Sequence, residues 1–441
     1  MAPLTDTIIP MLPNGAHSQP RLRRRRLLAT AAMLLGCSHA PSRVPAPAPA
    51  LPLYEGTIVV DPATGSLRGD WRVSFVRAAP TADSVVFLLN DALTITRISG
   101  SQVLGYSTSP EPDLSRITVR LGAAPTRAAT TIHFEYAGTP RFSADRINGI
   151  DSQWVELGLD SFWLPLFADL AHSIRSRVQV VLPRGWQVVS SGTTVRSGDT
   201  TTVTSIVPLI DIAFSASPSF ATAGGDSVTL DHVGESPAMV SRTLETARSC
   251  VRYLDARYGA EHPLPAIKLV LAPREGPGYA RRNYIVITRV ADSSVVPLGR
   301  FVCHELAHNW STGAFSSGPD NWLNESFAEF VSARFIRTTV GDSAYAGIVE
   351  QWKSRSAGQP PIWTPTTKAR PSARTAYAKA PYLLSRLEER VGSAAMNEIL
   401  RRFMTDPAIR TTPALIDMIY DVAGAETGGW FRAELEDRPG A

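Results

Sequence analysis

The chain has 441 residues, of which 44% are hydrophobic and 19% are charged. This composition excludes an intrinsically disordered protein and supplies enough apolar residues for a sizeable core. At about 100–200 residues per domain, the length predicts two or three domains. No apolar run reaches the roughly 18 residues of a membrane-spanning helix. Three cysteines are too few for a disulfide-rich scaffold.

The first 37 residues have the pattern of an export signal. Five arginines between positions 21 and 26 precede a short apolar stretch at 27–35, which is too short to span a bilayer but fits a signal peptide. The stretch ends in Leu-Leu-Gly followed by Cys37, which resembles a bacterial lipobox, where the cysteine receives lipid. Ser38 follows instead of the aspartate that favours inner-membrane retention, so we expect an outer-membrane lipoprotein on the periplasmic or surface side. An ordinary secretory signal with an accidental cysteine is the alternative.

Positive charge is concentrated in this leader. The formal net charge is +4, but five arginines and one aspartate precede position 37, so the rest of the chain is neutral. A neutral chain gives no reason to expect nucleic acid or an anionic membrane surface as a partner. Membrane contact is expected through the N-terminal lipid only. Residues 38–52 are rich in proline and alanine and predict a semi-rigid tether.

Residues 53–225 carry the signals of a β domain. Short segments rich in β-branched and aromatic residues alternate with turn residues, without a long helical pattern. Strands are predicted at 57–60, 71–75, 84–88, 117–119, 131–136, 178–182 and 201–207. Seven or more short strands predict a sandwich or a large open, saddle-like sheet. We interpret Trp154, Trp163 and Phe167 as core or interdomain packing rather than a ligand site.

The pattern changes after Gly225. Apolar residues recur at helical spacing in 238–258, and Gly259 is expected to end that helix. Two buried strands are predicted at 267–271 and 284–287. Further helices are predicted at 298–310, 321–338, 381–391, 395–404 and 413–422. The fold class is therefore α+β, with a mixed domain over 226–394 and a short helical tail over 395–441.

Residues 304–308 read H-E-L-A-H and carry the chemistry. Two histidines four positions apart lie on one helix face, so His304 and His308 can converge on one cation. Neutral imidazole and tetrahedral coordination suit zinc. Glu305 lies beside the metal without binding it and can accept a proton from a water molecule that the metal activates. The alternative, two solvated or capped histidines, fits poorly because the surrounding residues are apolar and unpaired buried histidines are costly.

A catalytic zinc site needs a third protein ligand and keeps one position open to solvent. Glu325 supplies it from a second apolar helix, after an intervening segment with glycine and proline that can turn the chain back. The other reading of Glu325 is a surface residue. Glu329 is one helical turn further along the same face. It is expected either to bond the outer nitrogen of a ligand histidine or to be solvated.

Three motifs together resemble peptidase family M1, the gluzincin group of aminopeptidase N and leukotriene hydrolase. The family reads H-E-L-A-H-x-W, then W-L-N-E-G-F-A, then Y-x-K-G before a leucine-rich helix. The chain has Trp310 two residues after His308, W-L-N-E-S-F-A at 322–328, and Y-A-K-A at 377–380. Ser326 replaces the family's glycine, and the spacing between His308 and Glu325 is two residues shorter than usual. The resemblance covers about residues 54–392.

The resemblance implies a thermolysin-like catalytic domain with one zinc ion, acting on peptide or protein substrates. It also implies that Tyr377 stabilises the transition state. A phenol hydroxyl aimed at a developing oxyanion would add a second electrophile beside the metal. Tyr382 is the nearest rival for this role. From the residues alone, Tyr377 would be read as a core or surface tyrosine.

One segment departs from the family. The family's G-x-M-E-N motif has a glutamate that binds the substrate's amino group, but here Arg282 stands in that position, before Asn283 and Tyr284. The resemblance implies that the strand at 284–287 lies at a sheet edge, where it could still hold a substrate backbone by strand addition. Arg281 or Arg282 could meet a carboxylate of the substrate, or either could be paired within the protein. The large helical C-terminal domain of many family members has no counterpart in this sequence, which predicts a more open cleft.

Cys250 and Cys303 complete the inventory of reactive residues. We expect two buried free thiols, with a disulfide as the alternative if the compartment is oxidising. No G-x-S-x-G occurs, and no cysteine–histidine pair is indicated beyond the chance neighbours 303 and 304, so nucleophilic hydrolases are disfavoured.

The predicted function is a zinc-dependent metallopeptidase, aminopeptidase-like but with altered recognition of the substrate's N-terminus. An endopeptidase or another peptide hydrolase using the same site is the first alternative. A lipoprotein that binds peptides without turnover is the second. The sequence carries no indication of the oligomeric state.

Overall fold

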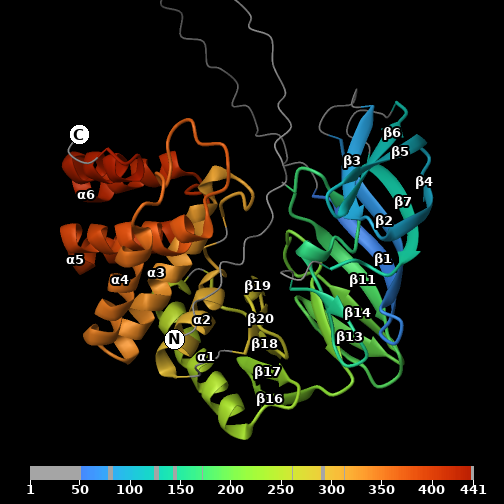
Figure 1. The fold of residues 1–441 in the computed structure, drawn as a ribbon, viewed down its shortest axis with the longest axis horizontal. Helices are drawn as coiled ribbons and strands as arrows, with labels where there is room; N and C mark the ends of the chain where they lie inside the picture. The colour runs from blue at the N-terminus through green and yellow to red at the C-terminus, as the bar shows by residue number, and fades with distance from the viewer. Residues whose placement is uncertain are drawn as a thin grey trace, which may run out of the picture.

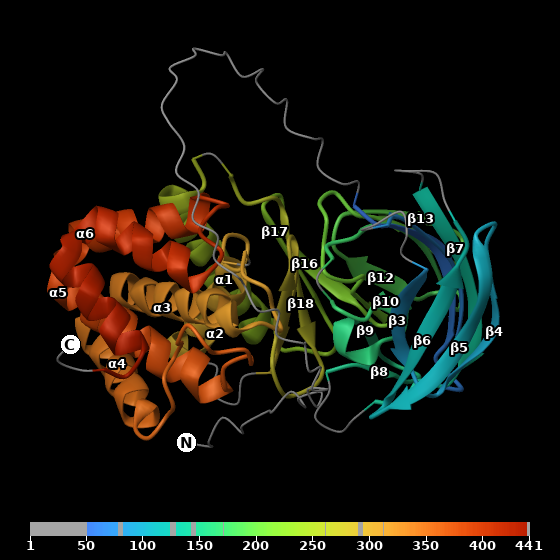
Figure 2. The same cartoon turned by 90° about the horizontal axis from the view of Figure 1, so that it is seen from above.

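The computed structural model describes residues 51–77, 83–123, 129–142, 147–170, 172–260, 262–289, 294–311 and 313–438. The predicted signal segment, Cys37 and almost the whole tether lie outside these residues. A β-rich half lies beside a mainly helical half, and the two are seen side by side from both directions (Figures 1 and 2). This arrangement confirms the predicted α+β class. Within the described residues, no helix combines the length and apolar character needed to cross a membrane.

Three sheets build the β-rich half. The largest contains, in order across the sheet, β13 (Thr193–Ser197), β14 (Thr200–Thr204), β11 (Arg175–Val181), β1 (Leu53–Asp61), β2 (Ser66–Val76), β7 (Ala129–Gly138) and β4 (Leu93–Ser99). A second contains β10 (Leu166–Phe167), β3 (Ser84–Asn90), β6 (Leu114–Leu121) and β5 (Val103–Glu111). The third contains β12 (Gln187–Ser190), β15 (Phe214–Ser217), β9 (Val155–Leu157) and β8 (Gly149–Ile150).

Alternation of buried and exposed residues explains the large sheet. Along β2, every second side chain is buried, which places Trp71 in the core. The Trp71 indole donates to the Tyr136 hydroxyl at 2.8 Å, and Tyr136 donates to the main-chain oxygen of Trp163 at 2.6 Å. Trp163 and Phe167 belong to this core, and Trp154 packs in a separate cluster with residues of the helical half. The interpretation of all three aromatic residues as packing is confirmed.

A five-stranded sheet opens the helical half. Its strands, in order, are β16 (Ala221–Gly225), β17 (Val228–His232), β18 (Ile267–Ala272), β20 (Tyr284–Thr288) and β19 (Tyr279–Arg281). The prediction that 284–287 forms the sheet edge was wrong. β20 is paired on both sides, parallel to β18 and antiparallel to β19, so β19 is the edge. Three residues are too few to give β19 a recognisable alternation.

In the part of the chain that the structure describes, six α-helices follow the pattern expected after Gly225, with one addition. They are α1 (Pro237–Tyr258), α2 (Val295–Ala307), α3 (Trp322–Thr339), α4 (Asp342–Ser356), α5 (Ala380–Thr405) and α6 (Thr412–Leu435). The sequence did not predict α4, where Ile348 and Trp352 alone are buried. α5 is two helical stretches joined at Gly392, which has φ 78°, as the predicted break required.

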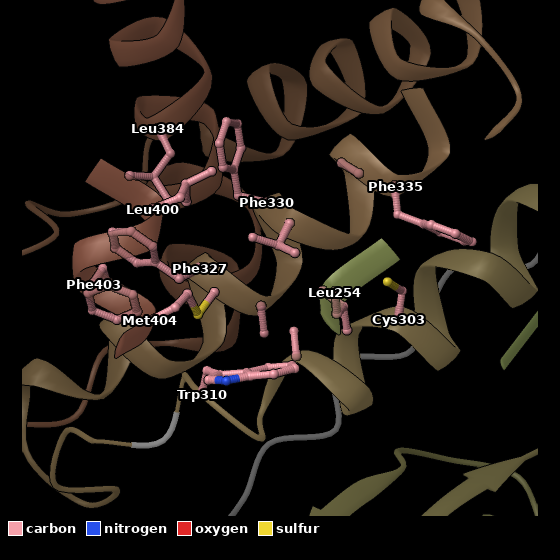
Figure 3. Close-up of a cluster of buried hydrophobic side chains, with 14 of the residues drawn as sticks. Leu254, Cys303, Trp310, Phe327, Phe330, Phe335, Leu384, Leu400, Phe403 and Met404 are labelled. Atoms are coloured by element: carbon pink, nitrogen blue, oxygen red, sulfur yellow. The ribbon is translucent and has the colours of Figure 1, made fainter. Parts of the chain in front are cut away.

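One hydrophobic core joins these helices. Figure 3 shows Phe327 of α3 against Phe403 of α5, and the two rings are stacked with centroids 3.6 Å apart. Leu254 of α1 and Leu400 of α5 belong to the same cluster. The helices after residue 394 therefore share a core with α2 and α3, the helices that carry the zinc motifs.

The expectation of two free thiols was wrong, because Cys250 of α1 and Cys303 of α2 form a disulfide. Spacing along the chain gave no measure of the distance between them. Helices α1 and α2 pack together and bring the two Cα atoms to 5.6 Å, within the range a disulfide requires.

Removing this disulfide should destabilise the fold by about 2–4 kcal/mol, because the bond closes a long loop in the unfolded chain. The variant for this test is Cys250→Ser with Cys303→Ser, and the measurement is denaturant unfolding beside the unaltered protein. Adding a reductant during unfolding should lower the unaltered protein's midpoint and leave the double variant's midpoint unchanged. Equal stability of the two proteins would contradict the prediction.

Candidate metal centre and active site

Two packed helices bring the predicted metal ligands together. α2 carries His304 and ends at His308, and the first turn of α3 carries Glu325. Nε2 of each histidine lies 3.6 Å from Oε2 of Glu325. One ligand atom from each of the three residues falls within 4.8 Å of the others. All three side chains are largely buried, so the cluster differs from an incidental group of surface charges.

The segment between the helices is shaped by side-chain hydrogen bonds. Asn324 accepts from the main-chain N–H of Ala314 and donates to its carbonyl, both at 3.0 Å. This pair of bonds folds the segment back onto the start of α3. Glu325, the next residue, is thereby aimed at the histidines. The chain turns back after His308, as the sequence predicted. The role of Asn324 in this turn was not predicted.

Glu329 lies behind the ligand set, one turn along α3. Its Oε2 is 3.3 Å from Nδ1 of His304, and its Oε1 contacts Arg300 and accepts from the Trp352 indole at 3.2 Å. Burial raises the pKa of Glu329, but Arg300 and His304 outweigh burial and hold it at about 2. Of the two readings of Glu329, the structure has the contact with a ligand histidine.

Glu329→Gln is expected to lower zinc affinity about 10- to 100-fold, because outer partners orient a ligand histidine and raise its basicity. Glu388→Gln is the matched control, since Glu388 is a similarly buried carboxylate whose partner is Arg334, at 3.2 Å, outside the ligand set. Competition with a chromophoric zinc chelator measures both variants. Equal zinc affinity in the two variants would show that Glu329 serves only to balance Arg300.

Glu305 is buried beside the ligands. Burial and the negative charge of Glu325 raise the pKa of Glu305 to about 7, although His304 and Arg281 act in the opposite direction. A carboxyl group with a pKa near neutrality can both accept and release a proton. Glu325 differs, because hydrogen bonds and charges from His304, His308 and Tyr377 overcome burial and hold its pKa well below the usual range. Glu325 is therefore a carboxylate, as a metal ligand must be.

Tyr377 lies in the π-helical turn η3 (Thr375–Lys379) at the entrance to α5. Its hydroxyl donates to Oε2 of Glu325 at 2.7 Å, and its ring stacks on His304 with centroids 5.5 Å apart. Burial and the charge of Glu325 raise the pKa of Tyr377 far above its usual value, so the phenol stays protonated. The rival, Tyr382, packs against the helical core on α5.

The four predicted substrate-binding residues separate into two groups. The side chains of Asn283 and Tyr284 contact residues of the β-rich half, and their role in binding substrate stays a prediction. Asn283 Oδ1 accepts from the main-chain N–H of Gly192 at 3.0 Å, and the buried Tyr284 hydroxyl bonds Ser215 at 2.7 Å. Both side chains therefore face the β-rich half, which the sequence alone could not show.

Arg281 and Arg282 make different contacts. Arg281 is paired with Asp211, whose Oδ2 lies 3.0 Å from Nη2, so the alternative of an internal ion pair holds for this residue. Arg282 has φ 56° in the turn between β19 and β20, and Nη1 donates to the main-chain oxygen of Asn309 at 3.2 Å. Among the described residues, Arg282 has no carboxylate partner.

Two charged residues near the site were missed. Nη2 of Arg370 lies 4.0 Å from Oε1 of Glu325, on the side away from the histidines, and its guanidinium faces the Asn321 amide. Asp211 comes from the β-rich half and neutralises Arg281. Neither residue belongs to a recognisable motif. Their roles depend on contacts between segments that are distant in sequence.

The donor set fits a zinc ion. Two imidazole nitrogens and one carboxylate oxygen are the donors that catalytic zinc sites use. Nδ1 of His304 is buried and makes no hydrogen bond of regular geometry, and it faces the Glu329 carboxylate instead. That arrangement leaves Nε2 free to point toward His308 and Glu325, as a ligand nitrogen must.

Comparisons with known proteins concern the domain and the fold. Residues 242–424 match the model of the peptidase family M1 domain. The fold is similar to the M1 zinc metallopeptidase from Deinococcus radiodurans, with 19% identity, TM-score 0.68, and coverage of 88% of this chain and 94% of that chain. It is also similar to native yeast LTA4 hydrolase, with 15% identity, TM-score 0.69, and coverage of 89% and 68%.

A curated relative matches over a much shorter stretch of sequence. Tricorn protease-interacting factor F2 of Thermoplasma acidophilum is 31% identical over 105 residues, which are 21% of this chain and 13% of that protein. The structural likenesses concern the fold, because their identities are low. The family match, in contrast, comes from the sequence, and it covers residues 242–424, less than half of the chain.

Proposed function

We propose that this chain, with its M1 domain, is a zinc-dependent metallopeptidase that hydrolyses peptide bonds. The observation that carries the proposal is the convergence of His304, His308 and Glu325 within 4.8 Å, from two helices. Glu305 lies on α2, the helix that carries His304, and Tyr377 lies on η3, with its hydroxyl against Glu325. A structural metal site would not require a proton acceptor and a phenol hydroxyl at its side.

The chain's own side chains account for proton movement and charge stabilisation. When bound, zinc supplies a Lewis acid that polarises the peptide carbonyl and makes water more acidic. Glu305 accepts a proton from the attacking water and passes it to the leaving amine. Its buried position next to His304 places the carboxylate beside the ligand set, where it can take part in both transfers. Tyr377, held in its protonated form, donates a hydrogen bond to the oxygen that becomes negative.

We propose that the chain recognises the terminus of its substrate differently from an aminopeptidase, which binds the substrate's amino group. A peptide's amino group needs an unpaired carboxylate, but two acidic groups beside the β19–β20 turn are already neutralised. Asp211 pairs with Arg281, and Glu156 accepts two hydrogen bonds from Arg274 at 2.7 and 2.9 Å. Arg282, without a carboxylate partner among the described residues, is proposed to meet a carboxylate of the substrate. The hydrolysis step itself is proposed to be the same as in an aminopeptidase.

Four versions of one short peptide test the proposal, with the N-terminus free or acetylated and the C-terminus free or amidated. Zinc content is measured on the same protein. Slower cleavage after amidation would support recognition of a carboxylate, whereas loss of cleavage after acetylation would contradict altered amine recognition. Equal cleavage of all four would indicate an endopeptidase. Zinc-loaded protein that cleaves none of a broad peptide library would refute the peptidase and favour a non-catalytic peptide-binding lipoprotein.

We also propose that the chain is anchored in a bacterial envelope through lipid on Cys37. The support is the order of basic residues, apolar stretch and Leu-Leu-Gly before this cysteine. Metabolic labelling with a fatty-acid analogue in a bacterial host should label the chain and not the Cys37→Ala variant. Labelling of both, or of neither, would contradict lipidation at this position.

A further inference from the structure

The backbone around Tyr377 has an uncommon conformation. It lies at the middle of η3, a single π-helical turn between the loop 357–374 and α5. Such turns are rare and occur frequently at functional sites. On its inner side, the turn presents the Tyr377 hydroxyl to Glu325 at 2.7 Å. The turn packs against α3 and α4, and contacts on its outer side add to that support.

Lys379 provides those outer contacts. Its Nζ donates to the main-chain oxygens of Gln359 at 3.0 Å and Pro360 at 2.8 Å. The same Nζ lies 2.7 and 2.8 Å from the two carboxylate oxygens of Asp437. An ammonium group has three donors, so these acceptors satisfy it completely. The Lys379 side chain is only 16% exposed, which makes the arrangement more than a loose surface pair.

Asp437 is itself held in place. It follows α6, and the main-chain N–H of Trp363 donates to the oxygen of Leu435 at 3.2 Å. Within the same loop, Ser372 accepts from the main-chain N–H of Thr375 at 3.1 Å and so fastens the first residue of η3. The loop, the π-helical turn that follows it and Asp437, which is distant in sequence, thus meet at Lys379.

We infer that Lys379 and Asp437 are positioning residues, which hold the Tyr377 hydroxyl against Glu325 from the opposite side of η3. Side chains two positions apart on a helical turn point in different directions, so Lys379 reaches the loop while Tyr377 reaches the ligand set. The position of Tyr377 follows from the contacts alone. Its effect on turnover rests on the proposed function.

The test compares Lys379→Met and Asp437→Asn with Arg386→Met. Arg386 is the matched control, because it ties α5 to α6 through Glu434, at 2.6 and 3.1 Å, without touching η3. Hydrogen exchange is measured on peptides that cover residues 372–380. We expect exchange there to be about tenfold faster in Lys379→Met, less so in Asp437→Asn, and unchanged in Arg386→Met. Unchanged exchange in Lys379→Met, or an equal rise in Arg386→Met, would overturn the inference.

A kinetic measurement separates positioning from general stability. With the best-cleaved of the four peptides, kcat of Lys379→Met should fall about tenfold with KM and zinc content little changed, because only a transition-state contact is loosened. A matching loss in Arg386→Met would mean that stability, not position, is responsible. If no peptide is cleaved by any protein, the proposed function fails, while the exchange measurement still decides the positioning role.

Discussion

Replacing Glu305 by glutamine is expected to lower kcat about 100- to 10,000-fold while zinc stays bound. Glutamine keeps the size of the side chain but cannot accept a proton from water. The three ligand side chains are untouched, so the metal content should match that of the unaltered protein. Steady-state cleavage of a peptide substrate, with zinc determined on the same preparation, checks both halves of the prediction.

Glu388→Gln is the control for this substitution. It also neutralises a buried carboxylate, but one that pairs with Arg334 and lies away from the ligands. Its kcat should stay within a small factor of the original. Full turnover by Glu305→Gln would refute the proposed proton transfer. Loss of zinc from Glu305→Gln would instead mean that Glu305 holds the metal, contrary to its place outside the ligand cluster.

Glu325→Ala is expected to weaken zinc binding more than Glu329→Gln does, by at least about 100-fold. The substitution removes a donor oxygen that lies 3.6 Å from both ligand nitrogens. It also removes the acceptor for the Tyr377 hydroxyl. Turnover should therefore be lost at ordinary zinc concentrations. Competition with a chromophoric chelator measures the affinity.

Thermal unfolding gives an independent measure of the same change. A ligand present at 100 times its dissociation constant stabilises the folded state by about 2.7 kcal/mol, so zinc should raise the melting temperature of the unaltered protein. The same zinc concentration should raise that of Glu325→Ala much less. A chelator should reverse the effect, and fresh zinc should restore it. Equal zinc stabilisation of both proteins would exclude Glu325 as a ligand.

Local spacing made the metal-ligand cluster predictable. The interval between His304 and His308 fixes their common helix face, and the apolar neighbours indicated that this helix is buried. The same reasoning placed Glu325 on a second helix. The break at Gly392 was also predictable, because a glycine can adopt the positive φ that ends a helical stretch.

Contacts between distant segments were not predictable. Arg281 and Arg282 are neighbours in sequence, yet one is paired with Asp211 and the other bonds a main-chain oxygen. Helix α4 escaped prediction because it buries only Ile348 and Trp352, which gives little periodic signal. The partners of the two arginines, and the elements against which α4 packs, take their positions only in the complete fold.

The bond between Cys250 and Cys303 has a consequence for how the protein matures. Cys303 is adjacent to His304, and a thiolate is a strong zinc ligand. A newly made chain with reduced cysteines therefore offers zinc a competing pair of sulfurs beside the correct nitrogen. Formation of the disulfide removes both sulfurs as competing zinc ligands. The order of events therefore matters: a chain that oxidises first offers zinc no thiolate at these two positions, whereas a chain that meets zinc first offers both.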